Sequence, residues 1–222
     1  MNINNELKDV LKTLSIDLDD RIIANINMYL DILFSWHAKN NILSTRDPIY
    51  FLKRDFFDSL SMLPYLPSGP ILDVGTGAGI PGILFAFIRN TENIILLDRR
   101  DNAIRFLEHV KLRLCLKNVD IIKSDVNKLE MNVKPSAILM KNFSNKIISK
   151  MDLESKLCHI ISIVRDKLRC DSKIFLLSGS NMLDINANKE SYEIKTKSKL
   201  AVTKIETPYF QTNRYILEIS DA

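Results

Sequence analysis

The residues best suited to binding a ligand form a glycine-rich run at positions 75–82, which reads GTGAGIPG. Four of the chain's six glycines lie in these eight residues, whereas one or two would be enough for a tight turn. Glycine tolerates positive φ and lets a ligand approach the main chain closely. A helix that starts at the end of this run adds free N–H groups. The run therefore predicts a loop that binds a nucleotide-like cofactor.

The spacing of Gly77, Gly79 and Gly82 leaves two cofactor classes open. It satisfies the G-x-G-x-x-G fingerprint of dinucleotide-binding proteins, so an NAD-dependent oxidoreductase is one alternative. Two features favour S-adenosyl-L-methionine instead. Asp73 precedes the loop, where a carboxylate can face the cationic amino-acid end of that cofactor but offers nothing to a pyrophosphate. The chain of 222 residues also leaves no separate substrate domain of the kind many dehydrogenases add.

Further polar residues follow the next predicted strands. Asp98 can accept hydrogen bonds from both hydroxyls of a ribose, or cap the helix that follows, or do both. The segment 124–127 is expected at the same sheet edge, where an adenine contact and a plain loop both stay open. Lys141, Asn142 and Phe143 follow the fourth strand, and a cation, an amide and an aromatic ring together can hold a base. This edge faces the transferred methyl group in the fold class, so Lys141 and Asn142 are the catalytic candidates, with a solvent-facing loop as the alternative.

An alternation of strands and helices positions these residues. Short apolar runs predict strands at 71–74, 94–97, 119–122, 137–140 and 173–177. Apolar residues at helical spacing predict helices at 81–89, 101–116 and 153–169. This order is typical of an α/β, Rossmann-like fold with a mainly parallel sheet covered by helices on both faces. Two strands at 200–206 and 214–219, with no helix between them, predict an antiparallel hairpin at the sheet edge.

The first part of the chain has a different pattern. Residues 1–66 predict a helical extension that packs on a core domain of residues 67–222, the two forming one structural unit. One helix is expected over 20–40, where apolar residues recur every three or four positions. A second helix is expected from Asp47, a capping residue followed by proline, to Pro64.

Composition narrows the class of protein further. A net charge of +4 is compatible with a polyanionic partner, although many other enzymes are as basic. Three widely spaced cysteines give neither a disulfide framework nor a zinc motif, and the three histidines are scattered, so no metal and a reduced, cytoplasmic protein are expected. The start of the chain lacks the pattern of a secretory signal. Its apolar runs fall short of the roughly 20 residues of a membrane span, so no membrane partner is expected.

The chain resembles the bacterial 16S ribosomal RNA guanine-N7 methyltransferases, also called the glucose-inhibited division protein B family. The resemblance rests on RDP at 46–48, FDSL at 57–60, DVGTGAGIPG at 73–82, LLD at 96–98 and RFL at 105–107. It implies methyl transfer from S-adenosyl-L-methionine to N7 of a guanine in 16S ribosomal RNA, guanine 527 in the standard numbering. The partner is then 16S ribosomal RNA or a precursor of the small ribosomal subunit. The resemblance also implies cofactor contacts at Gly75, Ile80, Val126, Asn127 and Lys141.

The sequence departs from the family pattern at positions that usually carry a positive charge or a histidine. Asp55 stands where the family usually has histidine, Lys141 where it has arginine, and Ser178 where it has lysine. A Lys-Arg pair of the family is replaced by Asn102 and Ala103. Each change removes or softens a positive charge near the expected RNA or cofactor site. A catalytically weakened RNA-binding relative is therefore the second alternative.

Overall fold

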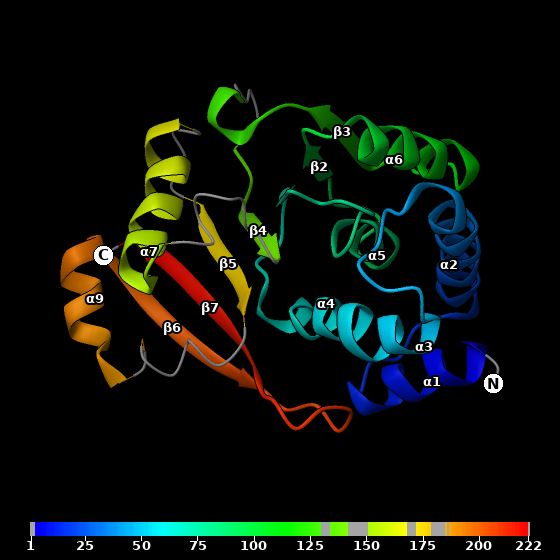
Figure 1. The fold of residues 1–222 in the computed structure, drawn as a ribbon, viewed down its shortest axis with the longest axis horizontal. Helices are drawn as coiled ribbons and strands as arrows, with labels where there is room; N and C mark the ends of the chain where they lie inside the picture. Colours follow the sequence, from blue (N-terminus) through cyan, green and yellow to red (C-terminus); the bar gives the residue numbers. More distant parts are fainter. Residues whose placement is uncertain are drawn as a thin grey trace.

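The fold is a seven-stranded sheet with helices on both faces, as Figure 1 shows. The computed structural model describes residues 3–129, 134–141, 151–167, 172–178, 185 and 187–221. Five strands run parallel: β1 (Ile71–Val74), β2 (Ile94–Asp98), β3 (Val119–Lys123), β4 (Ala137–Lys141) and β5 (Lys173–Ser178). All five confirm the predicted strands, and four of them extend one residue further. The α/β, Rossmann-like fold class is therefore confirmed.

The strand order creates a switch point beside β1. The order across the sheet is β3-β2-β1-β4-β5-β7-β6, so the chain turns to one side of β1 for β2 and β3 and to the other for β4 and β5. In open α/β sheets, ligands bind outside the carboxyl ends of the strands at such a point. The predicted glycine loop follows β1 directly, which puts it at this position.

The predicted C-terminal hairpin is also confirmed. β6 (Ser198–Ile205) and β7 (Arg214–Asp221) pair antiparallel, and β7 also pairs antiparallel with β5. β7 therefore lies between β5 and β6, although it follows both in the chain. The loop between β6 and β7 reaches the N-terminal helices, as Figure 1 shows, and there the Tyr209 hydroxyl donates to Asp9 at 2.8 Å.

Alternate residues of the strands build two apolar clusters, one on each face of the sheet. On β1, Ile71 belongs to one cluster and Leu72 to the other; on β2, Leu96 and Leu97 divide in the same way. The first face is covered by α5 (Gly82–Ile88), α6 (Asp101–Arg113) and the N-terminal helices. The second face is covered by α7 (Leu153–Ser162) and the π-helical turn η5 (Ile163–Lys167). The strands are apolar on both faces because both faces are covered.

The three helices predicted between the strands exist, but each α-helix is shorter than its apolar pattern. The 101–116 helix ends at Arg113, and Cys115 then takes the left-handed conformation with φ of 51°. The 153–169 helix changes to π-helical geometry at Ile163. A further helix, α9 (Lys189–Thr196), was not predicted because its sequence is mostly polar and presents no apolar stripe.

The N-terminal extension consists of several helical segments rather than two. These are α1 (Ile3–Thr13), α2 (Asp20–Asn40), α3 (Pro48–Phe51), the π-turn η1 (Leu52–Phe56), α4 (Phe57–Ser61) and the 3₁₀ turn η2 (Leu63–Tyr65). The predicted 20–40 helix is confirmed. Asp47 caps α3 by accepting from the amides of Ile49 and Tyr50, but the predicted single helix from Asp47 to Pro64 is interrupted by the π-turn.

The extension shares its apolar cluster with the sheet. Leu33 of α2 and Phe56 of the π-turn belong to the same cluster as Phe175 of β5. An ion pair adds to this contact, since Arg214 of β7 donates two hydrogen bonds to one carboxylate oxygen of buried Asp58, at 2.7 and 2.9 Å. We therefore expect residues 1–66 and 67–222 to unfold as one unit. No helix in the described part of the chain is both long and apolar enough to span a membrane.

Leu33→Ala tests this coupling, because Leu33 is fully buried on α2, the helix of the extension that packs against α5 and α6. The cavity should lower the free energy of unfolding by about 2–5 kcal/mol. Met28→Ala, on the same helix but 48% exposed, should change it by no more than about 0.5 kcal/mol. Urea unfolding is followed by circular dichroism and by the fluorescence of the single tryptophan, Trp36, on α2. Separate midpoints for the two signals would mean that the extension unfolds independently.

Candidate functional site

The glycine loop joins β1 to α5 in a conformation that needs glycine. Gly75, Gly77 and Gly79 have φ angles of 71°, 61° and 86°. At Gly79, a Cβ atom would lie 2.5 Å from Ile83 Cγ1 and 2.8 Å from Leu107 Cδ2, so this glycine packs inward against α5 and α6. Gly75 is exposed and Gly77 is partly exposed, so these two present their main chain outward, where a ligand can approach.

Asp73 holds the loop closed from inside. Its Oδ2 atom accepts hydrogen bonds from Thr76 Oγ1 at 2.7 Å and from the Gly82 amide at 2.9 Å, and the residue is 1% exposed. Burial raises the pKa of Asp73 to about 6, although the two hydrogen bonds lower it in part. The sequence predicted Asp73 as a cofactor contact. In this structure its carboxylate instead joins the first and last parts of the loop, and a direct contact with a ligand stays a prediction.

Tyr29 supports the same loop from the N-terminal extension. Its hydroxyl donates to the carbonyl oxygen of Ala78 at 2.7 Å, and its ring packs near Phe87 and Phe106. Burial raises the pKa of this hydroxyl well above its usual value, so it is a hydrogen-bond donor at neutral pH. The sequence analysis included Tyr29 only as part of the helix predicted over 20–40. A tyrosine among aliphatic residues was the available signal, since a buried hydroxyl requires a partner.

Asp98 lies at the end of β2 beside the loop and accepts four hydrogen bonds. The Gly77 amide donates to its Oδ2 atom at 2.9 Å, and the Arg100 amide donates to Oδ1 at 2.9 Å. The Arg100 side chain adds Nε to Oδ1 at 3.1 Å and Nη2 to Oδ2 at 3.0 Å. Burial alone would raise the pKa of Asp98, but these hydrogen bonds outweigh it and hold the pKa below its usual range. Asp98 thus ties the loop to Arg100, the residue just before α6. The N-cap of α6 is Arg100 and not Asp98, so the capping alternative is wrong.

Arg100 differs from Asp98 in its exposure to solvent. The Asp98 side chain is 4% exposed, whereas that of Arg100 is 59% exposed. A Cβ atom on Gly77 would lie 3.2 Å from Arg100 Nη2, so the guanidinium group lies over the outward side of the loop. Its two N–H groups face the two oxygens of Asp98, as two ribose hydroxyls would. The sequence analysis gave Arg100 no role.

Val126 and Asn127 lie at the carboxyl edge next to Asp98. They belong to a short 3₁₀ turn, η3 (Val126–Lys128), which Asp125 caps by accepting from the amide and the side chain of Asn127 at 3.0 and 2.9 Å. The Ser124 amide donates to the Asp98 carbonyl at 3.2 Å. Val126 is buried and Asn127 is exposed. The predicted cofactor contacts after β1, β2 and β3 are therefore neighbours along one sheet edge, together with buried Ile80 in the loop.

Lys141 is the last residue of β4 and lies at the same edge, but its ammonium group turns toward the N-terminal extension. Its Nζ atom lies 2.7 Å from the Asp55 carbonyl oxygen, 3.0 Å from Ser59 Oγ and 3.4 Å from Asp55 Oδ1. The side chain is 5% exposed. Burial lowers the pKa of Lys141, and the nearby carboxylates of Asp55 and Asp58 oppose this shift. Two departures from the family pattern, Asp55 and Lys141, are thus direct partners, which sequence reasoning treated separately.

The remaining predicted positions have different surroundings. Asn102 ties α6 to α2, because its side chain donates to the Asn40 carbonyl at 2.9 Å and accepts from Trp36 Nε1 at 3.4 Å. Ala103 is buried in the core, where a charged side chain would not fit without a partner. Ser178 pairs through its backbone with Tyr215 at the end of β5. Asn142 and Phe143 lie outside the described residues.

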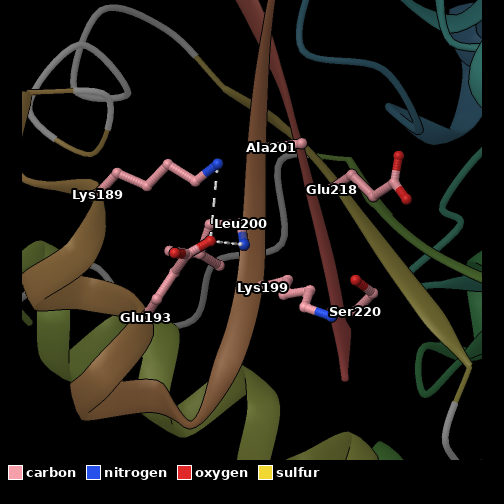
Figure 2. A pocket seen from close by; sticks show the side chains of 7 residues that line it. All are labelled: Lys189, Glu193, Lys199, Leu200, Ala201, Glu218 and Ser220. Atoms are coloured by element: carbon pink, nitrogen blue, oxygen red, sulfur yellow. Dashed lines mark hydrogen bonds and ion pairs between the residues drawn. The ribbon is translucent and has the colours of Figure 1, made fainter. Parts of the chain in front are cut away.

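A surface hollow of about 380 Å³ lies beside the C-terminal hairpin, several strands away from the glycine loop. Figure 2 shows the side chains that line it: Lys189, Glu193, Lys199, Leu200, Ala201, Glu218 and Ser220. Its acidic groups already have partners within the protein. Glu193 lies 3.7 Å from Lys189 and accepts from the Leu200 amide, and Glu218 pairs with Lys173 at 2.6 Å. The hollow is therefore not the candidate site. Among the described residues, no three His, Cys, Asp or Glu side chains gather as metal ligands.

Solved structures with a similar fold support the fold class. The chain is similar to the METTL16 MTase domain, with a TM-score of 0.60 and 15% identity over 87% of this chain and 80% of that one. It is also similar to the glycopeptide N-methyltransferase MtfA complexed with S-adenosyl-L-methionine, with a TM-score of 0.56 and 9% identity over 74% of this chain and 86% of that one. At these identities the likeness concerns the fold, which is that of the Rossmann-like methyltransferases.

The sequence comparison narrows this class to one family. Residues 22–214 match the family described as rRNA small subunit methyltransferase G, and the chain belongs to that family. Relatives named "Ribosomal RNA small subunit methyltransferase G" from Hahella chejuensis and Escherichia coli O17:K52:H18 are each 28% identical. The matches cover 99% of the chain and 94% of the first relative, and 97% of both chains for the second. A relative of the same name from Acinetobacter baylyi is 39% identical over 125 residues, 56% of this chain and 59% of that protein. The predicted family and enzyme class are confirmed.

Asp73→Asn tests the buried carboxylate through its pH dependence. The folded pKa of about 6 exceeds the ordinary value of 3.8, so folding favours the protonated form. The parent should therefore lose stability as the pH rises from about 4 through about 6, by up to ~3 kcal/mol relative to the asparagine variant, which cannot ionise. Urea unfolding of both proteins at a series of pH values measures the difference. A difference that does not change with pH would contradict the buried ionisation.

Tyr29→Phe tests the support of the glycine loop. The variant keeps the ring contacts but loses the hydrogen bond to Ala78, which should cost about 1 kcal/mol. Amide hydrogen exchange in residues 75–80 should become faster, because the loop loses its contact with α2. Exchange in β5 serves as the internal control. A lower thermal midpoint with unchanged exchange in the loop would mean that Tyr29 acts only in core packing.

Proposed function

We propose that this protein transfers the methyl group of S-adenosyl-L-methionine to N7 of a guanine in 16S ribosomal RNA. The substrate is the RNA itself or a precursor particle of the small ribosomal subunit, and the reaction takes place in the cytoplasm. The observation that carries the proposal is the family match over residues 22–214, which includes the loop that lies at the switch point beside β1. The relatives' printed names support a ribosomal RNA substrate.

The residues at the sheet edge fit this cofactor. The main chain of Gly75 and Gly77 faces outward, and we infer that an amino-acid moiety approaches it there once the Arg100 side chain moves away from Gly77. Asp98 has two carboxylate oxygens that now receive the Arg100 guanidinium, and a ribose diol offers the same pair of donors. Val126 and Asn127 supply an apolar and a polar neighbour for an adenine. When bound, the cofactor supplies a methyl group on a positively charged sulfur.

Methylation of N7 requires no proton transfer by acidic or basic side chains of the protein. N7 of guanine carries a lone pair and no proton, so no general base is needed. A bond forms between N7 and the methyl carbon as the carbon–sulfur bond breaks, and the positive charge passes from sulfur to the guanine ring. Catalysis is then mainly alignment of donor and acceptor, which can supply up to roughly 7–11 kcal/mol. The guanine has to be unstacked or already in a loop to reach the site.

A transfer assay and a binding assay together separate the proposed function from two rival functions. Purified protein is incubated with tritiated S-adenosyl-L-methionine and 16S ribosomal RNA, naked or in small subunits, from a strain that lacks this enzyme. We expect label in 7-methylguanosine, identified by mass spectrometry after digestion. Binding of S-adenosylhomocysteine without transfer would instead support a weakened RNA-binding relative. Binding of NAD and not of S-adenosylhomocysteine in calorimetry would support an oxidoreductase.

Gly77→Val provides the matched variant for this assay. A valine side chain at position 77 would approach Arg100 Nη2. The backbone φ of 61° at this position also costs a branched residue roughly 1–2 kcal/mol. The variant should stay folded by circular dichroism but lose measurable affinity for S-adenosylhomocysteine in calorimetry. Normal affinity in the folded variant would mean that the cofactor binds elsewhere.

A further inference from the structure

Asp55 bridges two cations at the border between the N-terminal extension and the sheet. Its Oδ1 atom lies 3.4 Å from Lys141 Nζ, at the carboxyl end of β4. Its Oδ2 atom accepts from Arg54 Nε at 3.0 Å and from Arg54 Nη2 at 2.5 Å. The Lys141 side chain is 5% exposed and that of Arg54 is 26% exposed. Asp55 therefore links the buried ammonium group of Lys141, at the carboxyl end of β4, to the guanidinium group of Arg54, which reaches the surface.

Arg54 lies against an exposed aromatic ring. Its guanidinium carbon is 4.7 Å from the centre of the Tyr50 ring, a cation–π distance. Its Nη1 atom donates to the Tyr50 hydroxyl at 3.3 Å, and its Nη2 atom donates to Ser44 Oγ at 2.9 Å. The ring of Phe210, from the loop between β6 and β7, meets the Tyr50 ring edge-on at 5.5 Å. These contacts hold both planar groups in place.

We refer to Tyr50, Arg54 and Phe210 as the aromatic cluster. Tyr50 is 39% exposed, although the helix on which it lies also carries the fully buried Phe51. Asp55 is shared by Arg54 and Lys141, so the two cations and one carboxylate leave one net positive charge here. Proteins that bind single-stranded nucleic acids stack bases on exposed aromatic rings and contact phosphates with arginine side chains. The aromatic cluster presents both kinds of group at the surface.

We propose that the aromatic cluster binds a single-stranded segment of the RNA substrate next to the nucleotide that is methylated. This inference rests on the proposed function and adds a contact surface to it. A base stacks on the exposed Tyr50 ring, and Arg54 contacts a phosphate. Asp55 and Lys141 are positioning residues: they fix Arg54 relative to the end of β4, which pairs with β1 beside the glycine loop. Stacking of this kind adds affinity with little base preference.

Tyr50→Ala is the first test of this surface. Methyl transfer to 16S ribosomal RNA is measured at saturating cofactor, and S-adenosylhomocysteine affinity is measured by calorimetry. Loss of one stacked base should raise the KM for RNA roughly tenfold, with kcat and S-adenosylhomocysteine affinity unchanged. Tyr50→Trp keeps an aromatic plane but loses the hydroxyl that bonds to Arg54, so it should retain a nearly parental KM. Tyr65→Ala is the matched control, because Tyr65 is 41% exposed and lies outside the cluster.

Arg54→Ala adds a readout that a purely structural role would not change. If Arg54 contacts a phosphate, the slope of log KM for RNA against log salt concentration should fall by about one unit. Arg54→Lys should keep this slope while raising KM, because lysine keeps the charge but not the planar double hydrogen bond to Asp55. Thermal midpoints identify any variant that has lost its fold.

Three results would overturn the inference. They are a parental KM in Tyr50→Ala, an equal loss in Tyr65→Ala, and a salt slope that does not change in Arg54→Ala. If the parent itself transfers no methyl group, the proposed function is wrong, and filter binding of the RNA to the same variants then tests the cluster separately. In that filter-binding assay, an RNA affinity of Tyr50→Ala equal to that of the parent would overturn the inference about the cluster.

Discussion

A buried carboxylate, Asp73, organises the edge of the sheet on which the candidate site depends. It joins the Thr76 hydroxyl and the Gly82 amide, so the two ends of the glycine loop are fixed to the strand that precedes them. The loop can then present Gly75 and Gly77 outward while Gly79 packs against the core. The arrangement holds a carboxylate away from water, and the raised pKa reflects that cost.

Charges around the site are arranged in pairs that join different parts of the fold. Asp98 ties the loop after β1 to the beginning of α6, and Asp58 ties α4 to β7. Lys141 ties β4 to the π-turn of the extension. The pairs of Asp58 and Lys141 connect the extension to strands that are distant in sequence, so the site's shape depends on the extension as well as on the sheet. Replacing Asp55 in the extension is therefore expected to change the surroundings of Lys141 at the end of β4.

Much of the fold followed from local patterns, because buried parallel strands are short apolar runs and the glycine spacing marks one particular loop. The partners of individual side chains did not. Lys141 and Asp55 are 86 positions apart, so their contact follows only from how the π-turn and α4 pack against β4. Tyr29 looked like one more core residue because its hydroxyl partner is a backbone carbonyl that no sequence pattern marks. The mostly polar α9 has no apolar stripe to predict it.

The position of β7 between β5 and β6 imposes an order on the assembly of the sheet. β6 is synthesised before β7, but it cannot join the sheet until β7 is present, because β7 is the strand that links β6 to β5. Until then, the exposed edge of β5 is an unpaired row of amide and carbonyl groups, the kind of edge that recruits strands from other chains. A nascent chain of this fold therefore remains open to intermolecular pairing on this side until residues 214–221 are in place.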